Sequence, residues 1–285
     1  MERRQTLIVL TTILVGLGAV GTFSKSASRA VTVGSFPGEM VDPDTIARLP
    51  RAGEISGEQA FEQAGKSAEI AGYSLSKVHR WLHERALKQI DPATGLYKAD
   101  GKWNYCDTAA DCYPFLAWAA YVVDAEALNG PVRDILHTEM KLCNHINRIP
   151  VPWDFGRNAK QEDLSWDRVV YEASEYVKNG LITIVEVTGK DEWFARMKGI
   201  EEDLWKHAKI DTPYGKIPST NVEINGEQLQ ALTRLYTMTG EKNFLTWAER
   251  LGDYYLTKGD CRQGREALAR QANLRYPAIP RIHGL

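Results

Sequence analysis

Hydrophobic residues recur at steps of three and four along most of this chain. The longest such stripe runs from Phe61 to Ala86. Apolar residues at this spacing lie on one face of a helix, so we predict a helix over 58–90. Six further segments have the same period and are also predicted to be helices: 112–125, 131–147, 168–187, 191–208, 225–238 and 241–257. The segment 181–187 is β-rich by composition, but it continues a helical stripe and is read as helix.

The predicted connections alternate in length along the chain. Short joins fall at 126–130, 188–190 and 239–240, and long ones at 91–111, 148–167 and 209–224. Antiparallel hairpins connected in this way place all the long loops on one side of the molecule. A weak repeat, EVTGKDEWFARM and TMTGEKNFLTWA, puts Gly189 and Gly240 where a left-handed residue ends a helix. The even-numbered helices are the more apolar, which indicates an inner layer wrapped by an outer one.

The chain of 285 residues is 44% hydrophobic, enough for a substantial core. The helical pattern predicts one all-α domain over 58–257. Residues 31–57 contain proline and glycine without a period and are predicted to be an extended lead-in. Residues 258–285 form a basic tail that does not continue the hairpin pattern.

The N-terminus has the pattern of a targeting segment. Arg3 and Arg4 precede an uncharged apolar run from Leu7 to Phe23, and small residues follow up to Ala30. This is typical of a secretory signal peptide cleaved before residue 31. The alternative is a retained N-terminal membrane anchor over residues 1–30. In either case the protein is expected outside the cytoplasm, with the membrane involved only through this segment.

Charge and cysteine spacing exclude several classes of protein. The net charge of −2 gives no basic footprint for nucleic acid. In an oxidising compartment the four cysteines can pair, and Cys106 and Cys112 are close enough to staple one loop, although the connectivity stays open. No CxxC or HxxxH spacing is identified as a metal-binding motif, and we predict neither a metal site nor a cofactor. No nucleophile motif accompanies the six histidines, which gives no basis for triad chemistry.

Three segments carry a family resemblance: DPATGLYKADGKWNYCDTAADCYPFL (91–116), YEASEYVKNGLI (171–182) and NGEQLQALTRLYTMTGEKNFLTWAERLGDYYL (225–256). Over about 60–257 the chain resembles the six-hairpin glycosidase-like superfamily, the (α/α) toroids that include unsaturated glucuronyl hydrolases. The resemblance implies a central cavity where sugar chains bind and acidic residues act. A closed ring of this type has twelve helices, whereas about seven are predicted here. The chain is therefore expected to be an incomplete toroid, namely a truncated relative, an open arc, or a ring completed by a second copy.

Acidic residues gather where the inner helices begin. Glycoside cleavage needs one carboxylic acid to protonate the leaving oxygen and one carboxylate as base or nucleophile. The alternative for each acid is an ordinary helix cap or a solvated position, and Asp111 in particular is well placed to be an N-cap. Glu223 is the least favoured of these acids as a catalytic candidate. The candidate catalytic residues are Asp107, Asp111, Glu172, Glu175 and Glu227.

Aromatic and basic residues of the long loops are the candidate substrate-binding groups. Aromatic rings suit the apolar faces of sugars, and the alternative is that they plug the loops onto the helix ends. His145 and Arg157 could bind an acidic sugar, or could simply be solvated. The candidate binding residues are Trp103, Tyr105, Trp153, Arg157 and His145.

The sequence therefore predicts an exported carbohydrate-active protein that cleaves an oligosaccharide by acid/base hydrolysis or elimination. The alternative, from another class, is a non-catalytic helical-repeat module that binds glycan or protein. An isoprenoid-processing toroid would share the hairpin pattern, but its metal and cyclase motifs are not found.

Overall fold

The computed structural model describes residues 57–255. The predicted signal or anchor segment, nearly all of the lead-in and the basic tail lie outside the described residues. The chain divides into two compact units, described separately below. The first holds the chain up to Lys88 together with Val122–Ala125, and the second holds Gln89–Tyr121 and the chain from Glu126 onward.

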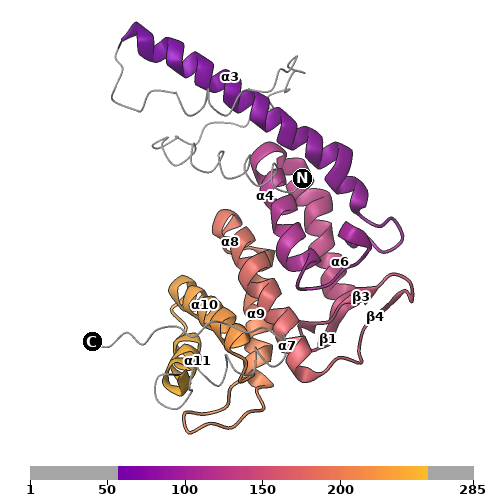
Figure 1. Cartoon of the computed structure of the whole chain (residues 1–285), viewed down its shortest axis with the longest axis vertical. Helices are drawn as coiled ribbons and strands as arrows, with labels where there is room; N and C mark the ends of the chain where they lie inside the picture. The colour runs from indigo at the N-terminus through magenta and orange to yellow at the C-terminus, as the bar shows by residue number, and fades with distance from the viewer. Residues whose placement is uncertain (1–56, 256–285) are drawn as a thin grey trace, which may run out of the picture. The chain divides into compact units, whose positions relative to one another are not determined.

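The first unit is built on the long helix α3 (Glu58–Trp81), which begins where the hydrophobic stripe predicts (Figure 1). A π-helical turn, η1 (Leu82–Ala86), and a 3₁₀ turn, η2 (Leu87–Gln89), continue it. Leu82 and Ala86 are buried, whereas Phe61 at the other end of the stripe is 83% exposed. In the described part of the chain, the stripe is thus buried only toward the C-terminal end of the helix.

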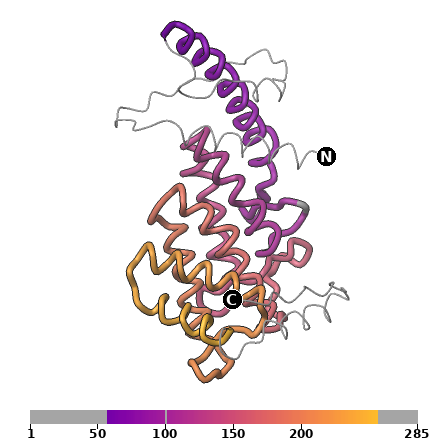
Figure 2. The backbone as a smooth tube through the Cα atoms, turned by 60° about the vertical axis from the view of Figure 1, so that its left-hand side comes forward, coloured from indigo at the N-terminus to yellow at the C-terminus, as the bar shows by residue number. Residues whose placement is uncertain are grey.

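Three helical hairpins follow one another along the chain (Figure 2). They belong to the second unit except for Val122–Ala125 in the first hairpin, which are grouped with the first unit. Most of them carry a π-helical or short helical segment in series with the main helix. The first hairpin comprises η4 (Thr108–Cys112), α4 (Tyr113–Val123), α5 (Ala125–Ala127), η5 (Leu128–Val132) and α6 (Arg133–Cys143). The second comprises α7 (Trp166–Glu175), η6 (Tyr176–Leu181), α8 (Ile182–Thr188) and α9 (Glu192–Lys206). The third comprises α10 (Val222–Thr239) and α11 (Lys242–Asp253).

The continuous helical run from α7 through α8 lies at the centre of this unit. It contacts η4, α9 and α10, while α11 packs on α10. The second, fourth and sixth helices predicted from the sequence correspond to η4–α4, α7–α8 and α10, and they are thus neighbours. Helices α9 and α11 pack against them. The predicted all-α class is confirmed, and the closed or partial ring stays a prediction. Among the helices of residues 57–255, none is both long and apolar enough to cross a membrane.

The hairpin turns form where the repeated glycines predict them. Gly189 (φ 81°) and Gly240 (φ 74°) both take the positive φ that favours glycine. Asp191 then caps α9, because its side chain accepts hydrogen bonds from the N–H groups of Trp193 and Phe194. Residues 181–187 are helical, as predicted from their stripe.

Two predicted boundaries are wrong. The helix predicted over 131–147 ends at Cys143, and β1 (Asn144–Ile146) then pairs with β2 (Ile149–Pro150) around Asn147, whose φ is 53°. A second small pair, β3 (Trp153–Asp154) with β4 (Ala159–Lys160), follows in the same loop. The predicted join at 126–130 is largely helical, with a kink at Gly130 before Pro131. Asparagine tolerates the left-handed region and proline disfavours the helical conformation in the residue before it, so local backbone preference overrode the hydrophobic period.

A buried ion pair ties the outer helices to the first long loop. Arg196 of α9 and Glu139 of α6 are almost fully buried, and Arg196 Nη2 lies 2.5 Å from Glu139 Oε1. The Tyr105 hydroxyl donates to the same carboxylate oxygen at 2.7 Å, and Arg196 Nη1 donates to the Arg148 carbonyl at 2.6 Å. Four chain segments therefore meet on one pair of charges.

Replacement of Arg196 by methionine should destabilise the protein strongly. The substitution leaves the Glu139 carboxylate buried without its cation, which typically costs about 3–5 kcal/mol. Urea unfolding of Arg196→Met measures this loss. The control is Glu186→Gln, which breaks the exposed Glu186–Arg234 pair and should change stability by less than about 1 kcal/mol. A loss for Arg196→Met as small as the control would contradict the role of the pair.

Candidate functional site

Three helical segments, η4, the α7–η6 run and α10, bring a group of acids together. The segment η4 packs against η6, and α10 packs against both α7 and η6. Gly180 of η6 permits the closest approach, since a Cβ atom there would lie 2.7 Å from the Ala109 carbonyl oxygen of η4. The packing places Glu175 of α7 beside Glu227 of α10, and Asp111 of η4 lies close enough to Glu175 to feel its charge.

The centre of the group is a pair of buried glutamates. Glu175 is 9% exposed and Glu227 is 5% exposed. Together with the exposed Glu223, one turn earlier on α10, each offers a carboxylate oxygen that lies within 4.8 Å of the other two. The Asn179 amide donates to Glu175 Oε2, while Glu227 Oε2 is buried without a hydrogen-bond partner.

Burial and the neighbouring acids hold Glu227 in its protonated form. Burial, the hydrogen-bonded contact with Glu175 and the charges of Glu175 and Glu223 raise its pKa to about 9, against a small opposing effect of Lys178. A carboxyl group this close to a second carboxylate is costly to ionise. Glu227 is therefore a proton donor that persists at neutral pH.

Exposed acids with opposite pKa shifts border the buried pair. The pKa of Asp111 is raised by burial and by the charges of Glu175 and Asp107. Asp107 has a lowered pKa because Lys102 Nζ and the Asn104 amide donate to its Oδ2, at 2.8 and 3.0 Å. Carboxyl groups whose environments push their pKa values apart are the usual arrangement of an acid and a base in one site.

A second layer of contacts holds the loop that carries Asp107. Glu172 is buried and accepts from the Tyr105 N–H at 3.1 Å and from Arg168 Nε at 2.8 Å. Arg168 Nη2 in turn lies 3.6 Å from Cys106 Sγ, whose pKa is raised to about 12, chiefly by burial. Glu172 is therefore a positioning residue, because both its oxygens are already used by the protein.

Of the acids that the sequence singled out, the structure brings Glu175 and Glu227 together, and the capping alternative is wrong for the three glutamates. Glu172, Glu175 and Glu227 are all buried, not solvated, and the caps of α7 and α10 are Ser165 and Asn221. Asp111 lies inside η4 and does not cap it. Asp107 occupies the N-cap position of η4 without a side-chain capping bond.

The aromatic residues predicted to bind substrate are buried or half-buried in the structure. Trp103 and Tyr105 are fully buried, and they pack edge to face with ring centroids 6.0 Å apart. Neither ring offers a face to a sugar in this structure. The alternative therefore holds for both, because these rings pack the loop against the helices. Trp153 is half-buried, and its N–H donates to the Trp103 carbonyl at 3.0 Å. Loop rings were mistaken for surface rings because sequence alone does not show what a loop folds onto.

Of the two basic candidates, His145 lies on β1 and Arg157 lies in the turn between β3 and β4. His145 is half-buried with Nδ1 3.6 Å from Glu162 Oε1, and Arg157 is exposed beside Asp154 at 3.7 Å. Each thus has an acidic partner in its own loop. Their proposed role toward an acidic sugar is unsupported by these contacts.

Sequence reasoning missed several residues of the site. Tyr171 has a raised pKa because of burial and of the charges of Cys106, Glu175, Glu223 and Glu227, which places it beside the acids. Lys178 and Asn179 follow Glu175 by three and four residues, a helical spacing that could have indicated them. The suggested Cys106–Cys112 staple is wrong, because Cys106 is a free thiol.

Two groups among the described residues have donors close enough for a metal ion. One is the trio of Glu175, Glu223 and Glu227, where the proton that Glu227 keeps already offsets the repulsion. The other consists of His79, His83 and Asp124 in the first unit. The two histidines are four residues apart, a helical ligand spacing that the sequence analysis overlooked.

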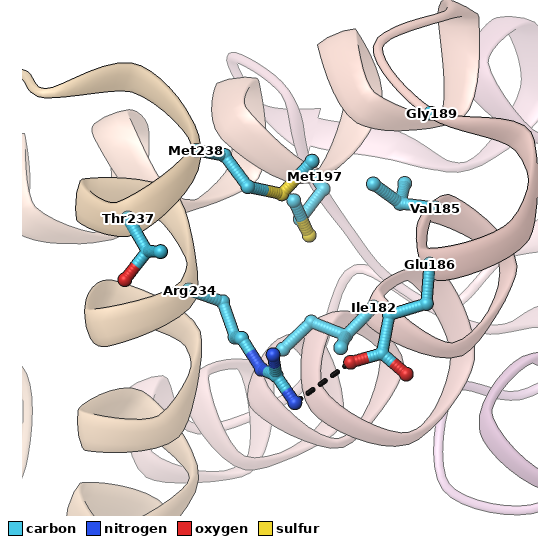
Figure 3. A pocket seen from close by; sticks show the side chains of 8 residues that line it. All are labelled: Ile182, Val185, Glu186, Gly189, Met197, Arg234, Thr237 and Met238. Atoms are coloured by element: carbon cyan, nitrogen blue, oxygen red, sulfur yellow. Dashed lines mark ion pairs between the residues drawn. The ribbon is translucent and has the colours of Figure 1, made fainter.

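A separate cavity of about 280 Å³ lies toward the C-terminal ends of α8 and α10 (Figure 3). Its wall is largely apolar, and an ion pair between Arg234 and Glu186 at 2.8 Å borders it. The lining residues are Ile182, Val185, Glu186, Gly189, Met197, Arg234, Thr237 and Met238. None of the clustered acids is among them, so the cavity and the acid group are distinct features.

The raised pKa of Glu227 predicts a specific dependence of stability on pH. Because the folded state favours protonated Glu227, this contribution is complete below the ordinary carboxyl pKa of 4.5 and is lost as pH rises through about 9. Glu227→Gln removes the titration and should be more stable than the parent at pH 9, by at least about 1 kcal/mol, since one pKa unit corresponds to about 1.4 kcal/mol.

Urea unfolding at pH 5 and pH 9 measures this difference. The matched control is Glu201→Gln, because buried Glu201 also has a pKa raised by burial, to about 8, but lies in the core beside Gln228. Both variants should be more stable to urea than the parent at high pH. A Glu227→Gln difference that is the same at both pH values would show that Glu227 is ionised throughout.

Comparisons with protein-family models, with curated proteins and with solved structures found no match to this chain. The resemblance to toroid glycosidases therefore stays a prediction from its motifs. What the chain can do has to be argued from the chemistry of the acid group itself.

Proposed function

We propose that this protein is an exported carbohydrate-active protein that cleaves oligosaccharides by acid/base chemistry at the acid group of η4, α7 and α10. The observation that carries the proposal is buried Glu227, which keeps its proton at neutral pH beside the carboxyl group of Glu175. A carboxylic acid that stays protonated at pH 7 is the group that glycoside cleavage needs as proton donor.

Each residue has a stated role in this proposal. Glu227 donates its proton to the oxygen of the leaving sugar, and Glu175 beside it helps to keep the pKa of Glu227 high. Asp107, whose pKa is lowered by Lys102 and Asn104, is the carboxylate available as base. In hydrolysis the base activates water, and in elimination it removes a proton from the sugar ring. Glu172 positions the loop through Arg168 and the Tyr105 N–H.

The choice of carbohydrate as substrate class is supported by the motif resemblance and by the type of residues at the site. The group is rich in carboxyls and hydroxyls, with Tyr171 beside the acids. Neither Trp103 nor Tyr105 is available as a stacking platform. The proposal therefore depends on the acids and not on an aromatic subsite.

A non-catalytic binding module is the second candidate, and one observation favours it. The loop aromatics are used in the core, while the three successive hairpins form the kind of array on which repeat proteins bind partners. In that case the carboxyls would bind sugar hydroxyls and would transfer no proton.

Substitution of the proton donor should separate the two candidates. Glu227→Gln should lower turnover of a susceptible oligosaccharide by about 100-fold or more, since general acid catalysis contributes about 10²–10⁴. Asp107→Asn should lower turnover by a similar factor if it is the base. Reducing-end release measures hydrolysis, and ultraviolet absorbance of the new double bond measures elimination, with neutral and uronic-acid oligosaccharides as substrates.

The matched control is Glu201→Gln, a buried glutamate with a raised pKa outside the group, which should leave turnover within a factor of about two. Thermal melting checks that each variant is folded. Sugar binding without turnover in the parent would favour the binding module. If the parent neither binds nor cleaves the oligosaccharides, the carbohydrate proposal is wrong.

A further inference from the structure

His79 and His83 lie side by side where α3 passes into η1. They are four residues apart, so they occupy the same face of the helix. Their ring centroids are 4.5 Å apart, with the planes tilted by 42°. His83 belongs to a π-helical turn, a local feature that is frequent at functional sites.

Asp124 completes a trio with the two histidines. Its Oδ2 lies 2.7 Å from His83 Nε2, and one donor atom from each of the three residues lies within 4.8 Å of the others. All three belong to the first compact unit, since Val122–Ala125 is grouped with the chain up to Lys88. Asp124 is nearer the interior, with 19% of its side chain exposed, while His83 is 42% exposed.

An ordinary ion pair does not account for this arrangement. His83 and Asp124 alone would form such a pair, but nothing in a His–Asp pair calls for a second imidazole beside it. His137 shows the ordinary case. Its ring nitrogens face two acids, Glu192 at 2.8 Å and Asp134 at 3.8 Å. At His137 one imidazole faces two carboxylates, whereas at Asp124 two imidazoles lie near one carboxylate.

Two imidazole nitrogens and one carboxylate oxygen form a donor set typical of zinc. Ligand atoms around tetrahedral zinc lie roughly 3.3 Å apart, given zinc–nitrogen distances of about 2.0–2.1 Å. Donor atoms within 4.8 Å of one another would need only small side-chain rotations to reach this spacing. Arg80, the nearest cation along the helix, is already paired with Glu84 at 2.9 Å.

We propose that His79, His83 and Asp124 form a zinc site that fastens the end of α3 to residues 122–125, with solvent at the fourth position. The first histidine is followed by Arg80 and not by the glutamate of a zinc-protease helix, so the site lacks the general base of that class. It lies outside the acid group and does not depend on the carbohydrate proposal.

Titration of the full chain with Zn²⁺, followed by calorimetry, tests the site. The parent should bind one equivalent more tightly than any other. His79→Gln, His83→Gln and Asp124→Asn should each lower the affinity at this site by about 10- to 100-fold. Co²⁺ offers a second readout, because its visible absorption should show nitrogen ligands in the parent and lose them in the double histidine variant.

The matched control is His137→Gln, which removes a surface histidine with acidic partners and should bind Zn²⁺ as the parent does. Zn²⁺ should also raise the melting temperature of the parent and of this control, but not of His83→Gln. Circular dichroism verifies that the variants fold. The proposal is overturned if the parent binds no Zn²⁺, or if His79→Gln and His83→Gln bind it as tightly as the parent.

Discussion

The second unit is organised around one buried pair of charges, Arg196 and Glu139. A charge removed from water is tolerated only when a partner and hydrogen bonds replace the lost solvent. Here that requirement is met by groups from four segments: α6, α9, the loop that carries Tyr105 and the turn at Arg148. The helices and loops must come to one geometry for the pair to be satisfied. The ion pair thus determines where the first long loop enters the core.

The placement of that loop matters for the acid group. Tyr105 is anchored on one side by its hydroxyl to Glu139 and on the other by its N–H to Glu172. Asp107 follows only two residues later, so the rigid core sets the position of an exposed carboxylate. Buried glutamates therefore serve two different purposes here. Glu139 and Glu172 are paired with arginines and hold structure, whereas burial and the neighbouring carboxylates outweigh the charge of Lys178 at Glu227, so its pKa is raised and it keeps a proton.

Several features of the site follow from sequence and several do not. The acids were found because helix starts can be read from hydrophobic periodicity, and the alternating loops indicated that these starts share one side. Their burial could not be predicted, because a glutamate near the start of a helix has the same local sequence whether it caps, is solvated or faces another carboxylate. The aromatics failed for a related reason. Composition cannot distinguish a ring that binds a ligand from one that fills the space under a loop.

By itself the sequence determined the helices, their hairpin order and the glycine turns, because these depend on interactions within a few residues of one another. It did not determine that α6 ends at Cys143, before the turn at Asn147, or that the helix is kinked at Gly130, before Pro131. Only the tertiary structure decided which acid keeps a proton, which rings are buried and which histidine meets Asp124. These outcomes depend on distances between residues far apart in the chain, for example His83 and Asp124. Such distances arise only when helices pack, and local sequence carries no record of them.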